Sequence, residues 1–127
     1  MGFLDKIFGG QEEAVPSKVN WKRLETTTLD AIAEQSFEKP AVIFKHSTRC
    51  SISRMALKQF EREYALDDEL DVYFLDLLEH RPLSNGIAER FGVQHESPQL
   101  IVIKDGKAVY NASHSAIQAD DLKRWAE

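Results

Sequence analysis

Hydrophobic and polar residues form two kinds of pattern along this chain. Short runs that are apolar almost throughout are typical of strands buried on both faces, whereas apolar residues at steps of three and four indicate helices with one face toward the core. The predicted strands are Trp21–Glu25, Ala41–Lys45, Leu70–Leu77, Leu100–Ile103 and Ala108–Tyr110. The predicted helices run from a cap at Thr27 or Thr28 to about Ser36, from just after Cys50 to Tyr64, from Arg81 to Phe91 and from about Ile117 to Trp125.

The second predicted helix has the clearest amphipathic spacing. Its apolar residues are Ile52, Met55, Ala56, Phe60 and Tyr64. Because steps of three and four residues bring side chains to one side of a helix, we expect this face to pack in the core.

Turn and capping residues support the same boundaries. Pro82 suits the first turn of the third helix, and Gly92 suits its C-terminal end. Asp105-Gly106 fits a two-residue turn that makes the last two strands an antiparallel pair. Helical crossovers indicate parallel neighbours among the earlier strands. The order β-α-β-α-β-α-β-β-α therefore predicts an α/β fold, with a mixed central sheet and helices on both faces.

The composition is that of one ordinary globular domain. Apolar residues make up 43% of the chain and charged residues 29%, and 127 residues suffice for a core without disulfides. We assign residues 18–127 to this domain and expect residues 1–17 to form an amphipathic turn and a linker. The turn has Phe3, Leu4, Ile7 and Phe8 on one face, and it either docks on the domain, forms a mobile arm or contacts a membrane surface.

Charge and cysteine content argue against several classes of protein. A net charge of −5 argues against nucleic-acid binding, which needs a concentrated basic face. No apolar stretch approaches the roughly 18 residues that span a bilayer. One cysteine cannot form an internal disulfide, so we expect a reducing, cytoplasmic location. The cysteine and the scattered histidines have no zinc-ligand spacing, and we expect no metal and no tightly bound cofactor. The oligomeric state stays open.

The single cysteine, Cys50, lies where a buried strand is expected to lead into a helix. The field of a first helical turn favours the thiolate, which is the nucleophile in disulfide exchange. A pKa about two units below the usual 8.5 would raise the thiolate fraction at pH 7 from roughly 3% to roughly three quarters, which corresponds to about 2.7 kcal/mol. Arg49 and Arg54 are candidates to add to this stabilisation. The alternative is an inert cysteine buried in the core.

Ser53 occupies the position at which a dithiol redox enzyme carries its second cysteine. A hydroxyl cannot resolve a mixed disulfide, so chemistry at Cys50 must use one thiol. Ser53 either donates a hydrogen bond to the Cys50 thiolate or is a surface residue. His46 is a candidate base or thiolate partner, or it caps the end of the sheet. The other histidines are interpreted as loop residues, of which the last could also contact a bound thiol: His80, His95 and His114.

The second half of the chain resembles a thioredoxin domain. The resemblance is carried by residues 87–93 and 97–107, and it extends from about Trp21 to Trp125. It implies a thioredoxin-like fold in which the peptide bond before Pro98 is cis and the proline faces the active cysteine. That geometry would aim the Ser97 backbone at the thiol, so that a partner peptide could pair with it as an added strand.

A narrower resemblance covers Phe44–Ser53, Glu96–Gln99 and Ala112–His114. These segments are similar to the monothiol bacilliredoxin family of the YtxJ type, whose members are linked to bacillithiol, a small cytoplasmic thiol of some bacteria. The resemblance implies a thiol–disulfide oxidoreductase in which Cys50 takes up bacillithiol, as co-substrate, from S-thiolated proteins. One departure is that Ser51 replaces the proline that usually follows the cysteine, which restores an N–H and adds a hydroxyl.

The resemblance also implies a set of residues that support Cys50 or bind substrate. They are His46, Thr48, Arg49, Ser51, Ser53, Ser97 and Pro98. Two alternatives use the same cysteine without this reaction. The protein could be a non-catalytic redox sensor or adapter, or it could carry an iron–sulfur cluster shared between two chains.

Overall fold

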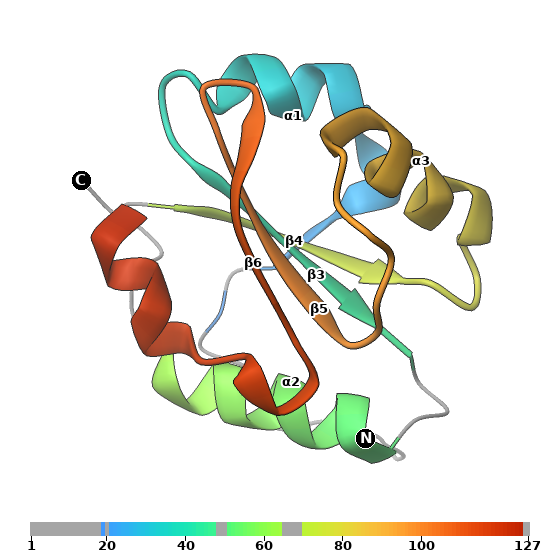
Figure 1. Ribbon diagram of the computed structural model, residues 1–127, viewed down its shortest axis with the longest axis vertical. Helices are drawn as coiled ribbons and strands as arrows, with labels where there is room; N and C mark the ends of the chain where they lie inside the picture. Colours follow the sequence, from blue (N-terminus) through green and yellow to red (C-terminus); the bar gives the residue numbers. More distant parts are fainter. Residues whose placement is uncertain (1–18, 20, 48–50, 65–69, 126–127) are drawn as a thin grey trace, which may run out of the picture.

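The computed structural model describes residues 19, 21–47, 51–64 and 70–125 (Figure 1). Its strands and helices, in chain order, are β2 (Lys22–Arg23), η1 (Leu24–Thr26), α1 (Leu29–Gln35), β3 (Ala41–His46), α2 (Ser51–Glu63), β4 (Asp71–Asp76), α3 (Arg81–Phe91), β5 (Gln99–Lys104), β6 (Lys107–Ser113), η2 (His114–Ala116) and η3 (Ala119–Trp125). Within these ranges, no helix is both long and apolar enough to cross a bilayer.

The five described strands form one mixed sheet in the order β2-β4-β3-β5-β6. Strands β2, β4 and β3 are parallel, whereas β5 is antiparallel to β3 and β6 is antiparallel to β5. The turn between β5 and β6 is Asp105-Gly106, and both residues have positive φ, as a tight hairpin turn requires. The predicted mixed α/β sheet is therefore confirmed.

Strand β3 lies in the middle of the sheet and is buried along its whole length. Helices α1 and α3 cover one face of the sheet, and α2 and η3 cover the other (Figure 1). Successive side chains of β3 enter opposite layers: Ile43 packs in the α1 and α3 layer, and Phe44 packs in the α2 layer. Covering on both faces explains why this strand is an almost unbroken apolar run.

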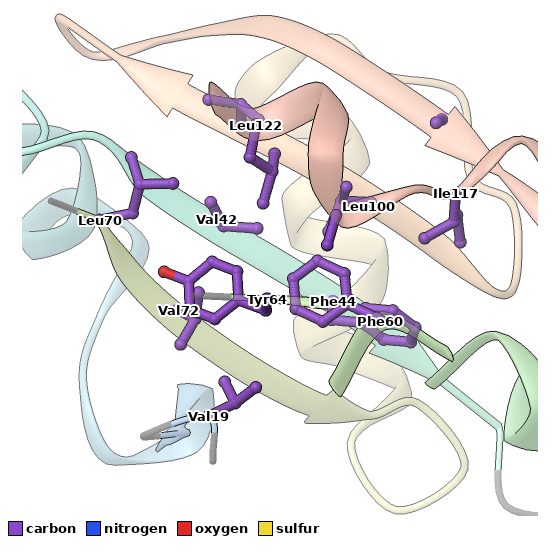
Figure 2. Close-up of a cluster of buried hydrophobic side chains, with 13 residues drawn as sticks. Val19, Val42, Phe44, Phe60, Tyr64, Leu70, Val72, Leu100, Ile117 and Leu122 are labelled. Carbon is purple, nitrogen blue, oxygen red and sulfur yellow. The ribbon is translucent and has the colours of Figure 1, made fainter. Parts of the chain in front are cut away.

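The α2 layer is built around stacked aromatic rings. Figure 2 shows Phe44 of β3 beside Phe60 of α2, and their ring centroids are 5.6 Å apart. Tyr64 stacks on Phe60 at 5.2 Å. Each fully buried aromatic side chain of this size contributes about 2–3 kcal/mol to folding. These contacts fix the position of α2 against the C-terminal half of β3.

The helix boundaries follow from specific capping residues. The Thr28 hydroxyl accepts a hydrogen bond from the Ala31 N–H at 3.0 Å and so caps α1. Pro82 lies in the first turn of α3, and Gly92 ends that helix in the left-handed conformation with φ +67°. All three boundaries were predicted from the sequence.

Two predicted elements differ from the structure. The first strand is only two residues long, because the chain turns into η1 at Leu24, whose side chain is buried. The last helix was expected to be α-helical from about Ile117, but it is a 3₁₀ helix that begins at Ala119. Ile117 itself is extended, with ψ 118°, and this backbone conformation places its side chain in the α2 layer.

Candidate functional site

The candidate site lies at the C-terminal end of β3, where the chain leads into α2. Thr48, Arg49 and Cys50 lie outside the described residues. The structure describes the residues on both sides of them, Ser47 after β3 and Ser51 at the start of α2. The site is therefore built from its described neighbours.

Ser53 is fully buried and joins α2 to the end of β3. Its hydroxyl accepts a hydrogen bond from the Ser47 N–H at 3.0 Å and lies 2.7 Å from Nδ1 of His46. Both bonds bridge the segment that contains Cys50. The hydroxyl of Ser53 thus ties together the two ends of the β3–α2 connection.

This register of α2 differs from the predicted one. Ile52 and Met55 were expected in the core, but they are 55% and 70% exposed, and that prediction is wrong. The buried side of α2 instead presents Ser53 near its start and Phe60 further on. A serine can occupy the buried position because its hydroxyl has partners there.

His46 is buried, only 4% exposed, and its ring lies 5.5 Å from that of Phe74. Burial lowers the pKa of His46, Asp76 raises it, and Arg54 lowers it further. The ring is therefore neutral at pH 7. Neutral His46 and the Ser53 hydroxyl can share their hydrogen in two ways. Ser53 either donates to Nδ1, or accepts from Nδ1–H and keeps its own hydrogen for another acceptor.

The loop before β5 lies at the same end of the sheet. Lys45 pairs with Gln99 in register, so Pro98 lies at the end where β3 leads into α2. The Ser97-Pro98 peptide bond is cis, as predicted. The buried Ser97 hydroxyl has no hydrogen-bond partner in the described part of the chain.

The side chain of Gln99 braces this loop from inside. Its amide nitrogen donates to the Gln94 carbonyl at 2.9 Å, and its amide oxygen accepts from the Glu96 N–H at 3.3 Å. The Pro98 carbonyl accepts from the His114 N–H at 3.0 Å. These bonds hold the backbone around Pro98 from two sides.

The sequence interpretation missed a buried cation on β3. Lys45 is fully buried, and burial lowers its pKa to about 8. Its Nζ lies 3.2 Å from Nδ1 of His95, and the Ser84 hydroxyl lies 3.4 Å from the same nitrogen. Burial and the charge of Lys45 lower the pKa of His95, so the neutral ring accepts from the ammonium.

His95 was interpreted as a surface loop residue, but it is a hydrogen-bond partner of buried Lys45. One signal in the sequence could have revealed the burial of Lys45, although not its partner, because Lys45 follows four apolar residues in a strand expected to be buried on both faces. The other two loop histidines are nearer the surface. His114 lies 3.8 Å from Glu96, and His80 lies 3.7 Å from Glu25.

The ends of β3 and α2 and the loop before β5 thus meet at one edge of the sheet. Across the residues that the structure describes, no three His, Cys, Asp or Glu side chains form a group that could hold a metal ion. The described groups can position a neighbouring side chain and supply positive charge from Lys45.

Comparison with known proteins agrees with this geometry. Residues 22–122 match the family described as "Monothiol bacilliredoxin BrxC". A solved structure described as a candidate oxidoreductase with a thioredoxin fold is 32% identical, with a TM-score of 0.67, over 84% of this chain and 94% of that chain.

More distant solved structures share the fold. The thioredoxin of Malassezia sympodialis is 17% identical, with a TM-score of 0.61, over 90% of this chain and 94% of its own. The thioredoxin of Plasmodium falciparum is 14% identical, with a TM-score of 0.62, over 85% of this chain and 100% of its own. The fold is thioredoxin-like.

Proposed function

Since the chain belongs to the monothiol bacilliredoxin family, we propose that it is a thiol–disulfide oxidoreductase that removes bacillithiol from protein cysteines. Cys50 is the nucleophile, and the small thiol is a co-substrate that does not stay bound. Its protein partners are S-thiolated proteins, in the reducing environment of the cytoplasm. The single observation that carries this proposal is the family match. The one cysteine of the chain supplies the nucleophile.

The proposed reaction has two exchange steps. The Cys50 thiolate attacks the small-thiol sulfur of a mixed disulfide, the S–S bond to the protein breaks, and the protein cysteine leaves as a thiolate. A second molecule of the small thiol, as its thiolate, then attacks the small-thiol sulfur bound to Cys50. This step releases a symmetrical small-thiol disulfide and restores the Cys50 thiolate. Electrons balance, because one free small thiol is oxidised for each protein cysteine that is reduced, and the small thiol of the mixed disulfide keeps its oxidation state.

Electrostatics at the start of α2 support a reactive thiolate. Cys50 directly precedes Ser51, the first residue of a 13-residue helix, and the N-terminal end of a helix carries a partial positive charge. Lys45 adds a buried positive charge at the same end of β3, on the α3 side of the sheet, where its Nζ lies 3.2 Å from Nδ1 of His95. Both effects favour the ionised form of a thiol over the neutral one.

The other predicted residues take supporting roles in this proposal. Thr48, Arg49 and Ser51 surround the nucleophile in sequence and stabilise its charge. His46 and Ser53 position the segment between β3 and α2. The backbone at Ser97 and Pro98 receives the partner peptide.

The test is a transfer assay followed by mass spectrometry. A model protein with one bacillithiol-modified cysteine is mixed with the reduced chain, and we expect the small-thiol mass on Cys50. The Cys50→Ser variant should take up nothing. Parallel substrates modified with glutathione or coenzyme A establish which small thiol is preferred.

Turnover separates an enzyme from a redox sensor. With excess bacillithiol, we expect many substrate molecules to be reduced for each chain. One adduct for each chain and no further turnover would support the sensor instead. No adduct with any substrate would contradict the proposed reaction.

A further inference from the structure

Helix α2 presents two large apolar side chains to solvent. Ile52 and Met55 lie within the first five residues of the helix and are mostly exposed. The core does not need them, because Ser53 and Phe60 fill the buried side. Since Cys50 directly precedes the helix, both lie within five residues of the nucleophile.

A stripe of positive charge runs beside these apolar residues. Arg54, Lys58 and Arg62 are all exposed, and their spacing of four residues places them along one line of the helix. Met55 lies one residue from Arg54 and three from Lys58, so the stripe and the apolar pair adjoin. The chain as a whole has a net charge of −5, which makes this basic stripe a local exception.

The two acidic residues of α2 lie in its last turn, away from Cys50. Glu61 accepts a hydrogen bond from Trp21 Nε1 at 2.7 Å, on the side of the helix that faces β2. Glu63 is the last residue of α2, furthest from Cys50, and it accepts a hydrogen bond from Gln59. The first two turns of α2 therefore contain basic side chains and no carboxylate.

We propose that the α2 face, formed by Ile52, Met55, Lys58 and Arg62, binds an acidic segment of the thiolated protein. In that segment, carboxylates lie against Lys58 and Arg62, and one apolar side chain lies against Ile52 and Met55. Charge complementarity selects this partner and speeds its encounter. The inference rests on the proposed function, because it names the protein substrates that Cys50 would serve.

Another large apolar side chain is exposed at a different place on the molecule. Phe37 is also highly exposed, but it follows α1 and lies beside Gly106 in the hairpin turn. It precedes β3, whereas Ser51 follows that strand, so Phe37 lies at the opposite end of the sheet. Phe37 and Lys107, an exposed residue of β6 next to that turn, therefore provide matched controls.

Binding is measured by fluorescence anisotropy with the full-length reduced chain. The probe is a labelled 12-residue peptide with several Asp and Glu residues, one Leu, and Ser in place of the cysteine, so that no exchange can occur. A second probe has Asn and Gln instead of the acids. We expect the acidic probe to bind about threefold to tenfold more tightly at low salt, and the difference to vanish at high salt.

Variants locate the binding surface. Lys58→Glu and Met55→Ser should each weaken binding of the acidic probe by about threefold to tenfold. Lys107→Glu and Phe37→Ser make the same chemical changes at the other end of the sheet and should leave the affinity within twofold. Equal effects of the two lysine variants, or equal affinity for both probes, would overturn the proposal.

The transfer reaction separates this proposal from the function itself. Lys58→Glu should slow transfer from a thiolated acidic peptide and leave the exchange with a symmetrical small-thiol disulfide unchanged. If the chain bound the acidic probe more tightly than the neutral one but took up no small thiol at Cys50, the docking surface would be supported and the oxidoreductase function refuted. If Cys50 took up the small thiol and Lys58→Glu transferred it from the acidic peptide as fast as the unmodified chain, the oxidoreductase function would be supported and the docking surface refuted.

Discussion

The Ser53 hydroxyl gives the sharpest test of how the site is held together. Ser53→Ala removes one oxygen and leaves two groups without their partner, the Ser47 N–H and His46 Nδ1. Ser47 is half-buried, so water can reach its N–H, but His46 is buried. The substitution therefore leaves one buried polar group unsatisfied, which lowers the free energy of unfolding by about 1–3 kcal/mol.

For a chain of this length, that loss lowers Tm by roughly 3–12 °C. Urea unfolding followed by tryptophan fluorescence gives the free energy of unfolding, and Ser51→Ala is the matched control, because Ser51 is exposed at the start of the same helix. The control should change stability by less than about 0.5 kcal/mol. If Ser53→Ala were no more destabilising than Ser51→Ala, the proposed tie between β3 and α2 would be wrong.

Three further predictions concern other parts of the molecule. Ser53→Cys supplies a thiol at the spacing of a dithiol enzyme, so the mixed disulfide with the small thiol should no longer accumulate in mass spectra. Burial lowers the pKa of Lys45 from 10.5 to about 8, so the unfolded chain binds this proton more tightly. As the pH increases from about 8 to 10.5, the free energy of unfolding should therefore rise relative to that of Lys45→Met, and urea titrations at both ends of this range measure the difference. An equal pH dependence in the variant would contradict this prediction. Gly106→Ala should cost about 1–3 kcal/mol by thermal unfolding, because Gly106 has φ +78° and a Cβ there would lie 3.3 Å from the Phe37 ring.

Local signals in the sequence predicted much of the fold. The apolar run of β3, the cap at Thr28 and the stop at Gly92 each depend on nearby residues, and each is present in the structure. The mixed sheet followed from the order of these elements together with the hairpin at Asp105-Gly106.

The register of α2 could not be predicted in the same way. Counting apolar residues favoured Ile52 over Ser53 as the buried position. The outcome depended on two hydrogen-bond partners of the hydroxyl at the end of β3, His46 and Ser47, which the fold of the β3–α2 connection brings to it. The same holds for Lys45, because its partner His95 is fifty residues away in the sequence. Polar groups in a core are decided by tertiary partners, and no local pattern encodes them.

The buried amine of Lys45 links the stability of the fold to the proposed rate of disulfide exchange. An apolar residue in its place would relieve the unfavourable burial of a charge, but it would also remove a cation from the edge of the sheet where disulfide exchange is proposed. Substitutions of Lys45 that raise the thermal stability of the protein should therefore slow disulfide exchange.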